Sequence, residues 1–216
     1  MNDRSWIAAL TGVAFLVLAI ASVALGGGEP PDPTDDPVEE IVEFYADNEG
    51  NVWVSVLLQG LATVALVFFA GYLRKVLRAA EGPGHMLSSV VLAGATILAT
   101  GIAIDATLNI TLVETAEDLE PGAVQALAAL WHNDFMPMAV GGMVFLLAAG
   151  LSIVRHGALP AWLGWAAIVI AVASITPAGF IAFLLAALWI AGVSVMLALR
   201  ERRAGPTPPA TPPVAA

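Results

Sequence analysis

Residues 52–73 read VWVSVLLQGLATVALVFFAGYL, an uncharged run that decides the class of fold. A membrane hydrocarbon core is about 30 Å thick, and a helix that rises about 1.5 Å per residue needs about 20 apolar residues to cross it. Backbone amides in lipid must bond within their own segment, and the run lacks the strict alternation of a barrel strand. The stretch therefore predicts a transmembrane helix.

Further apolar runs approach or meet the same length: residues 6–25, 87–113, 135–154, 161–176 and 178–199. The run 161–176 is short, and Pro160 and Pro177 bracket it. The chain of 216 residues is 59% hydrophobic and only 12% charged, and its mean hydropathy is +0.85. These values lie outside the range of soluble globular proteins. We therefore expect an all-α polytopic membrane protein, with a bundle of six transmembrane helices in residues 1–203.

The basic residues lie in alternate connections between these runs. They are Arg4, Arg74, Lys75, Arg78, Arg155, Arg200, Arg202 and Arg203. Lys and Arg are retained on the cytoplasmic side of membrane proteins, so this pattern predicts a multi-pass protein of the cell membrane with both termini in the cytoplasm. An even number of spans agrees with that orientation. Most acidic residues lie in two of the opposite connections, within 29–49 and 114–120, as expected when the cations are kept inside.

Two segments of these acidic connections have helical spacing of apolar residues. Residues 36–50 begin with Asp36, which can cap a helix, and end at Gly50, which can terminate one. A second amphipathic segment begins at Pro121. We expect two short amphipathic helices on the outer face. The Pro-rich segment 204–216 predicts a disordered cytoplasmic tail.

The sequence contains no cysteine, which excludes disulfides, thiolate chemistry and Cys-ligated metal centres. It also lacks the HExxH, GxSxG, P-loop and dinucleotide-binding motifs. We therefore predict no cofactor and no nucleic-acid partner, and we lean towards a protein that is not an enzyme.

Two carboxyl groups, Asp105 and Asp134, lie within or at the head of the predicted spans, where ionisable groups usually have a function or a partner. Helical spacing places Asp105 and Asn109 on one face of their span, and a spacing of four aligns Ser55 with Gln59 on another. These positions predict an outer-leaflet polar pocket lined by Ser55, Gln59, Asp105, Asn109, His132, Asn133 and Asp134. The alternative is simple interhelical hydrogen bonding by Asp105.

Residues 131–138, WHNDFMPM, place an imidazole, an amide and a carboxyl group side by side, immediately before a long apolar run. His132, Asp134 and Asp105 could bind a divalent metal ion. Residues i and i+2 of a regular helix point to opposite sides, however, so this requires a helix break, which Pro137 favours. The alternative is that Asn133 or Asp134 caps the next helix.

Three stretches form motifs at the boundaries of the predicted spans. They are FYADNEGNVW at 44–53, LRKVLRAAEG at 73–82 and RHGALPAWLGW at 155–165. Together they resemble small six-span bacterial membrane proteins of uncharacterised families, such as domain-of-unknown-function family 4386. The resemblance implies the six-span topology and no activity.

Three classes of function remain. The first is a non-enzymatic membrane protein that binds or stabilises a lipid, a membrane protein partner or a second copy of itself. The second is a small-solute or ion transporter that uses Asp105 and Asp134, and it requires that these carboxylates line a continuous cavity. The third is a membrane enzyme with a divalent metal in the polar pocket, and it requires that His132, Asp134 and Asp105 converge.

Overall fold

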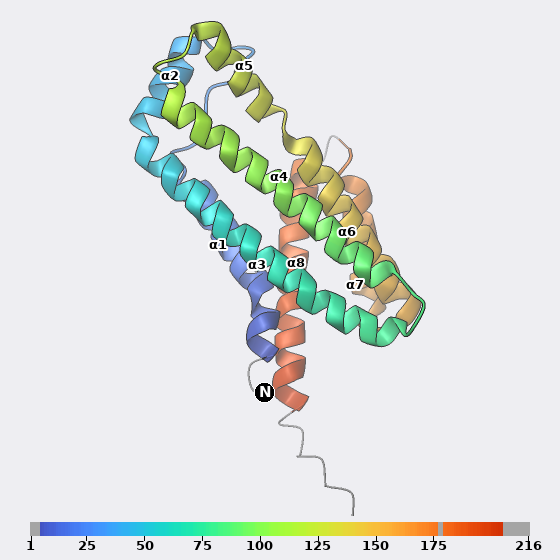
Figure 1. Ribbon diagram of the computed structural model, residues 1–216. Helices are drawn as coiled ribbons and strands as arrows, with labels where there is room; N and C mark the ends of the chain where they lie inside the picture. The colour runs from blue at the N-terminus through green and yellow to red at the C-terminus, as the bar shows by residue number, and fades with distance from the viewer. Residues whose placement is uncertain (1–4, 177–178, 205–216) are drawn as a thin grey trace, which may run out of the picture.

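The computed structural model describes residues 5–176 and 179–204, and all regular structure in these ranges is helical (Figure 1). The helices are α1 (Ser5–Leu25), α2 (Val38–Asp47), α3 (Glu49–Glu81), α4 (Leu87–Thr115), α5 (Pro121–His132), α6 (Phe135–His156), α7 (Ala161–Ala173) and α8 (Gly179–Ala204). Arg4, Pro177, Ala178 and residues 205–216 of the predicted tail lie outside the described residues, and Ala204, predicted to begin that tail, is instead the last residue of α8. The predicted all-α class is confirmed for the described residues.

Five helical segments are long and apolar enough to cross a membrane: Trp6–Leu25, Glu49–Glu81, Leu87–Thr115, Pro121–His156 and Ile181–Arg203. The fourth joins α5 and α6 across a short break. By contrast, α7 has 13 residues, which gives a rise of about 20 Å, less than the hydrocarbon thickness. The predicted span extended to residue 176. In the structure the regular helix ends at Ala173, and Ser174 to Thr176 form a turn.

Large apolar side chains cover much of the outside of the bundle. Examples on α1, α3 and α7 are Val23, Leu57, Phe68, Val169 and Val172, which are between 57% and 79% exposed. Soluble monomers rarely expose apolar surface this extensively, whereas a membrane-embedded helix presents such residues to lipid. The surface is therefore compatible with the membrane class deduced from composition.

The described basic residues all lie near the ends of α3, α6 and α8, at one end of the bundle. Three contacts bring these ends together: the Arg202 guanidinium 4.5 Å from the Trp6 ring centroid, Arg200 Nη1 donating to the Ala158 carbonyl at 3.0 Å, and the His85 and His156 rings at 4.7 Å. We call this the basic end. The opposite end carries α2, α5 and the acidic connections, and we call it the acidic end (Figure 1).

Glycines set the closest helix pairing in the bundle. The most extensive contact is between α4 and α6. A Cβ atom added at Gly94 would lie 2.4 Å from the Phe145 backbone nitrogen, and one at Gly141 would lie 2.2 Å from that of Leu98. The absence of side chains at these positions allows the two backbones to touch, as small residues do between helices in membranes.

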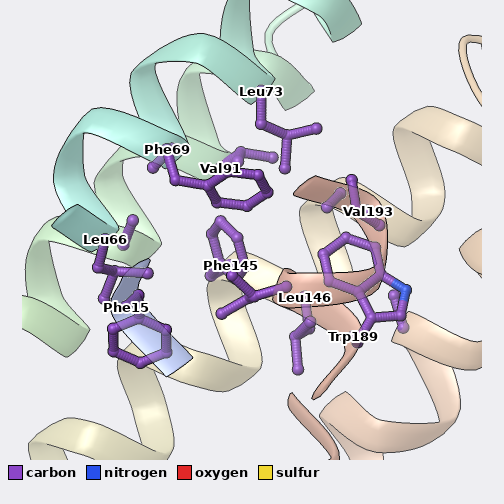
Figure 2. Packing of buried hydrophobic residues seen from close by; sticks show 14 of the residues in the cluster. Phe15, Leu66, Phe69, Leu73, Val91, Phe145, Leu146, Trp189 and Val193 are labelled. Carbon is purple, nitrogen blue, oxygen red and sulfur yellow. The ribbon is translucent and has the colours of Figure 1, made fainter. Parts of the chain in front are cut away.

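The main core lies inside the bundle and includes side chains from α1, α3, α4, α6 and α8 (Figure 2). Phe145 and Trp189 form an edge-to-face pair with ring centroids 6.2 Å apart. The Trp189 indole donates to the Leu163 carbonyl at 2.9 Å, so this mid-helix tryptophan also binds α7 to α8. The polar handle of a buried tryptophan is thereby satisfied.

A second, smaller core lies at the acidic end, where α2 and α5 pack on the ends of α3 and α4. Ile41 and Tyr45 of α2, Leu112 of α4 and Val124 of α5 are fully or almost fully buried there. The two short helices of the sequence analysis therefore form a cap on the bundle. Asp36 does not cap α2, because its carboxylate accepts the Asp32 N–H at 2.8 Å, and Gly50 lies within α3.

Candidate functional site

The cap and the bundle meet in a polar cluster centred on Asp105 of α4. Asn109, one turn further along α4, donates from Nδ2 to the Asp105 carbonyl at 3.2 Å and lies 3.5 Å from its carboxylate oxygen. Tyr45 of α2 donates to Asn109 Oδ1 at 3.4 Å. Burial and the nearby Asp105 carboxylate raise the pKa of Tyr45, so its hydroxyl remains a donor.

Gln59 of α3 and Trp131 of α5 face the same carboxyl group of Asp105. Trp131 Nε1, a donor, and Gln59 Oε1, an acceptor, are both buried without a hydrogen-bond partner among the described residues. Asp134 Oδ2 is buried in the same way, and its charge repels that of Asp105. Four helices and the turn before α6 thus contribute polar groups to one site, most of them weakly bonded.

The break predicted within WHNDFMPM is present. The helix α5 ends at His132, Asn133 and Asp134 have turn conformations, and α6 begins at Phe135 with Pro137 in its first turn. The side chain of Asp134 makes no cap hydrogen bond. Asn133 Nδ2 instead donates back to the Ala129 carbonyl at 2.8 Å. The break therefore turns Asp134 towards Asp105 and leaves α6 without a side-chain cap.

Three residues of the predicted pocket lie elsewhere. His132 and Asn133 are exposed. The imidazole of His132 lies near Asp32, whose pKa is lowered mainly by hydrogen bonds from Thr34 and slightly by this histidine. Ser55 faces the end of α1, where a Cβ atom on Gly26 would lie 3.3 Å from its hydroxyl. The structure thus gathers Gln59, Asp105, Asn109 and Asp134 from the predicted set.

Tyr45 and Trp131 belong to the cluster but not to the pocket residues predicted from the sequence. Their rings lie in the second, apolar core. A buried tyrosine or tryptophan usually requires a partner for its polar atom, and this was the available signal. The partner itself depends on how α2 and α5 dock, which helical periodicity does not determine.

Asp134→Asn is expected to raise the free energy of unfolding by about 0.5–2 kcal/mol at pH 8. The reason is that it replaces an acidic group, in a poorly solvated site next to the Asp105 carboxyl group, by a neutral amide of the same shape. Thermal unfolding of the purified protein in detergent measures the effect. The exposed Asp47→Asn is the control and should leave the stability unchanged. A marked loss of stability in Asp134→Asn would contradict the repulsion.

A second feature is a cavity of about 790 Å³ at the side of the bundle, between α6 and α8. Its volume is within the range of about 300–1,000 Å³ typical of small-molecule sites. It lies where α7 ends, because Ser174, Ile175 and Thr176 line it and, as far as the chain is described up to Thr176, no helical turn of α7 continues between α6 and α8 there. The short seventh helix therefore creates the cavity.

The cavity is apolar and opens sideways. Phe135, Met136 and Ile175 at its margin are between 55% and 63% exposed, whereas Leu146 and Ile190 at its inner end are about 1% exposed. This cavity was not predicted from the sequence. The shortness of segment 161–176 was its only signal, and the position of the resulting gap depends on tertiary packing.

A smaller cavity of about 480 Å³ lies between α2 and the connection before α5. Neither cavity is lined by Asp105 or Asp134. Within the described residues, no group of three or more His, Asp or Glu side chains is arranged to hold a metal ion. The polar cluster thus joins the cap to the bundle, and the apolar cavity is the larger space for a ligand.

The resemblance to domain-of-unknown-function family 4386 stays a prediction. Comparison with protein-family models, with curated proteins and with solved structures finds no match to this chain.

Proposed function

We propose that this chain is a non-enzymatic protein of the cell membrane that binds the acyl chain of a lipid in the cavity between α6 and α8. The observation that carries the proposal is the cavity itself: it is about 790 Å³ in volume, almost wholly apolar and open on the side of a membrane-compatible bundle. Its exposed margin would face the hydrocarbon of the bilayer, where lipid chains are the most abundant apolar molecules.

The same proposal includes the topology. All six segments cross or enter the membrane, with the basic end and both termini in the cytoplasm. Two facts support this orientation: the described basic residues gather at one end, and α2, α5 and their acidic connections gather at the other. A membrane partner or a second copy of the chain stays a prediction.

The two alternative functions have less support. A transporter would be expected to have carboxylates along a cavity, but Asp105 and Asp134 line neither of the cavities described above. A metal enzyme would need His132 beside Asp105, but His132 lies near Asp32. Both stay predictions of the sequence pattern.

Gly142→Leu is expected to abolish most of the lipid retained by the protein. Gly142 lines the cavity, and a Cβ atom at this position would meet nothing within 4 Å, so a leucine has room and fills the space that the chain would occupy. Native mass spectrometry of the protein purified in a mild detergent, with phospholipid added back, measures the bound lipid.

The matched control is Gly60→Leu on α3. Its Cβ atom also meets nothing within 4 Å, and it does not line the cavity, so lipid retention should match that of the unmodified protein. Equal retention by Gly142→Leu and Gly60→Leu would contradict the proposed function.

A further inference from the structure

The basic end carries an excess of positive charge. Its described cations are all exposed, and they are Arg74, Lys75, Arg78, Arg155, Arg200, Arg202 and Arg203. Two described carboxylates lie among them. Glu81 is buried and accepts hydrogen bonds from two serines, and Glu201 accepts one from the Tyr72 hydroxyl at 2.7 Å. Seven cations against two carboxylates leave an excess of five positive charges, which attracts anions.

Two tryptophans indicate the depth of these cations in a membrane. Trp162 lies in the first turn of α7, directly after the connection 157–160, and is 64% exposed. Trp6 lies in the first turn of α1, and the Arg202 guanidinium is 4.5 Å from its ring centroid. Tryptophans of membrane proteins are enriched at the interface, where their rings sit at the level of the lipid headgroups. In a bilayer the neighbouring arginines would therefore lie beside lipid phosphates.

Two of the arginines lie at the connection between α6 and α7. Arg200, near the end of α8, donates from Nη1 to the Ala158 carbonyl at 3.0 Å, so its guanidinium is held against this connection. Arg155 lies in the last turn of α6, three residues before Ala158. We call Arg155 and Arg200 the basic pair.

The basic pair keeps hydrogen-bond donors for an anion. A guanidinium has five N–H donors, and the Ala158 carbonyl accepts from only one nitrogen of Arg200. Arg155 has no hydrogen-bond or ion-pair partner among the described residues. The planar fork of a guanidinium fits two oxygens of one phosphate, which an ammonium group cannot do. Both side chains are therefore available to bind phosphate oxygens at this connection.

We propose that the basic pair binds the phosphate of an anionic phospholipid from the leaflet at the basic end. The excess of cations attracts the lipid, and the tryptophans place its headgroup at the level of the two guanidinium groups. The inference goes beyond the proposed function and does not depend on the cavity between α6 and α8, which neither arginine lines.

Competition between headgroups tests the proposal. The full-length protein in a mild detergent is given equal amounts of phosphatidylglycerol and phosphatidylcholine with identical chains, and native mass spectrometry measures each bound lipid. We expect phosphatidylglycerol to be retained on the order of 20-fold more, because each of two nearby cations contributes about fivefold. The preference should shrink at high salt. Equal retention of the two lipids would overturn the proposal.

Arg200→Gln and Arg202→Gln form a matched pair of variants. The two arginines are two residues apart on α8 and point to nearly opposite sides, Arg200 to the α6–α7 connection and Arg202 to Trp6 of α1. Each variant removes one positive charge. Arg200→Gln should lower the preference for phosphatidylglycerol about fivefold, and Arg202→Gln should change it by less than about twofold. Equal losses would show a diffuse attraction without a site and would overturn the proposal.

Arg155→Gln separates binding from an effect on the fold. Arg200 also holds the α6–α7 connection through Ala158, whereas Arg155 has no partner among the described residues that its substitution could disturb. We expect the same fivefold fall in preference with an unchanged melting temperature in detergent. An unchanged preference in Arg155→Gln would overturn the assignment of the basic pair.

Two further measurements identify the source of the phosphate and separate this site from the cavity. Inorganic phosphate and glycerophosphoglycerol, the water-soluble headgroup, should not displace phosphatidylglycerol at equal concentration, and displacement by either would overturn the choice of a lipid. Gly142→Leu should lose bound phosphatidylcholine but still retain phosphatidylglycerol at the basic end. If Gly142→Leu lost both lipids, the cavity would be the only lipid site and the proposal would be wrong, whereas the proposed function would stand.

Discussion

Glu81→Ala is expected to lower the free energy of unfolding by about 3 kcal/mol. Glu81 is the last residue of α3, is only 4% exposed, and accepts three hydrogen bonds. Ser88 donates to it from its backbone N–H and from its hydroxyl, both at 2.8 Å, and Ser152 of α6 donates at 2.7 Å. Alanine would leave these buried donors without their acceptor, and each such donor costs about 1–3 kcal/mol unless it finds a new partner.

The position of Glu81 adds to this effect. Ser88 lies in the first turn of α4, where the N–H groups have no partner within the helix, and Met86 provides no side-chain cap. The Glu81 carboxylate therefore takes the role of a cap and interacts favourably with the helix dipole. One side chain thus joins α3, α4 and α6 at the basic end.

Equilibrium unfolding in detergent micelles measures the loss. Ser152→Ala should cost about 1 kcal/mol, since it removes one of the three donors, and the double variant should show coupling with Glu81→Ala. Glu29→Ala is the control, because Glu29 is exposed, and its effect should stay within about 0.5 kcal/mol. The hydrogen bonds of Glu81 do not act together if Glu81→Ala costs less than about 1 kcal/mol, or if the effects of Glu81→Ala and Ser152→Ala simply add in the double variant.

The hydrogen bonds of Glu81 could not be predicted from the sequence. The apolar run ends at Leu73, which places Glu81 in a connection, but α3 continues to Glu81 because every residue of RKVLRAAE except Val76 is a good helix former. Its partner Ser152 is 71 residues away. Local pattern predicts that a helix extends, but it carries no information on which distant hydroxyl a carboxylate will meet.

The helices themselves were predictable, because runs of apolar residues and short amphipathic segments each correspond to one physical requirement. The break at Asn133 and Asp134 was also predictable, because Pro137 disfavours a continuous helix there. Within the polar cluster, Asp105 and Asn109 were expected together because one helix carries both at a spacing of four.

The remaining parts of the site depend on packing between distant segments. Tyr45 reaches Asn109 because α2 folds back over the bundle, and the apolar cavity exists because α7 ends early between two longer helices. His132 was expected in the pocket from its neighbours in sequence, but the turn after α5 leaves it exposed. Adjacent residues in a turn point in directions that only the turn conformation determines.

Gly141→Ala is expected to lower the free energy of unfolding by about 1–3 kcal/mol, the usual cost of overpacking. The new Cβ atom would lie 2.2 Å from the Leu98 backbone nitrogen and 2.6 Å from its Cα atom. Backbone atoms cannot rotate away as a side chain can, so α6 must move from α4 along the whole length over which they pack. Lipid cannot restore the dispersion attraction between the two helices, because it packs less closely against a helix than a second helix does.

The adjacent Gly142→Ala provides a closely matched control. The same methyl group is added one residue further along the same helix, where it meets nothing within 4 Å. This variant should be neutral or slightly more stable, because alanine favours a helix over glycine by up to about 1 kcal/mol. Thermal unfolding of both variants in the same detergent separates the close approach of α4 and α6 from general intolerance of α6 to substitution. Equal melting temperatures for the two variants would contradict the close approach, whereas a loss in Gly141→Ala alone would locate it at Leu98.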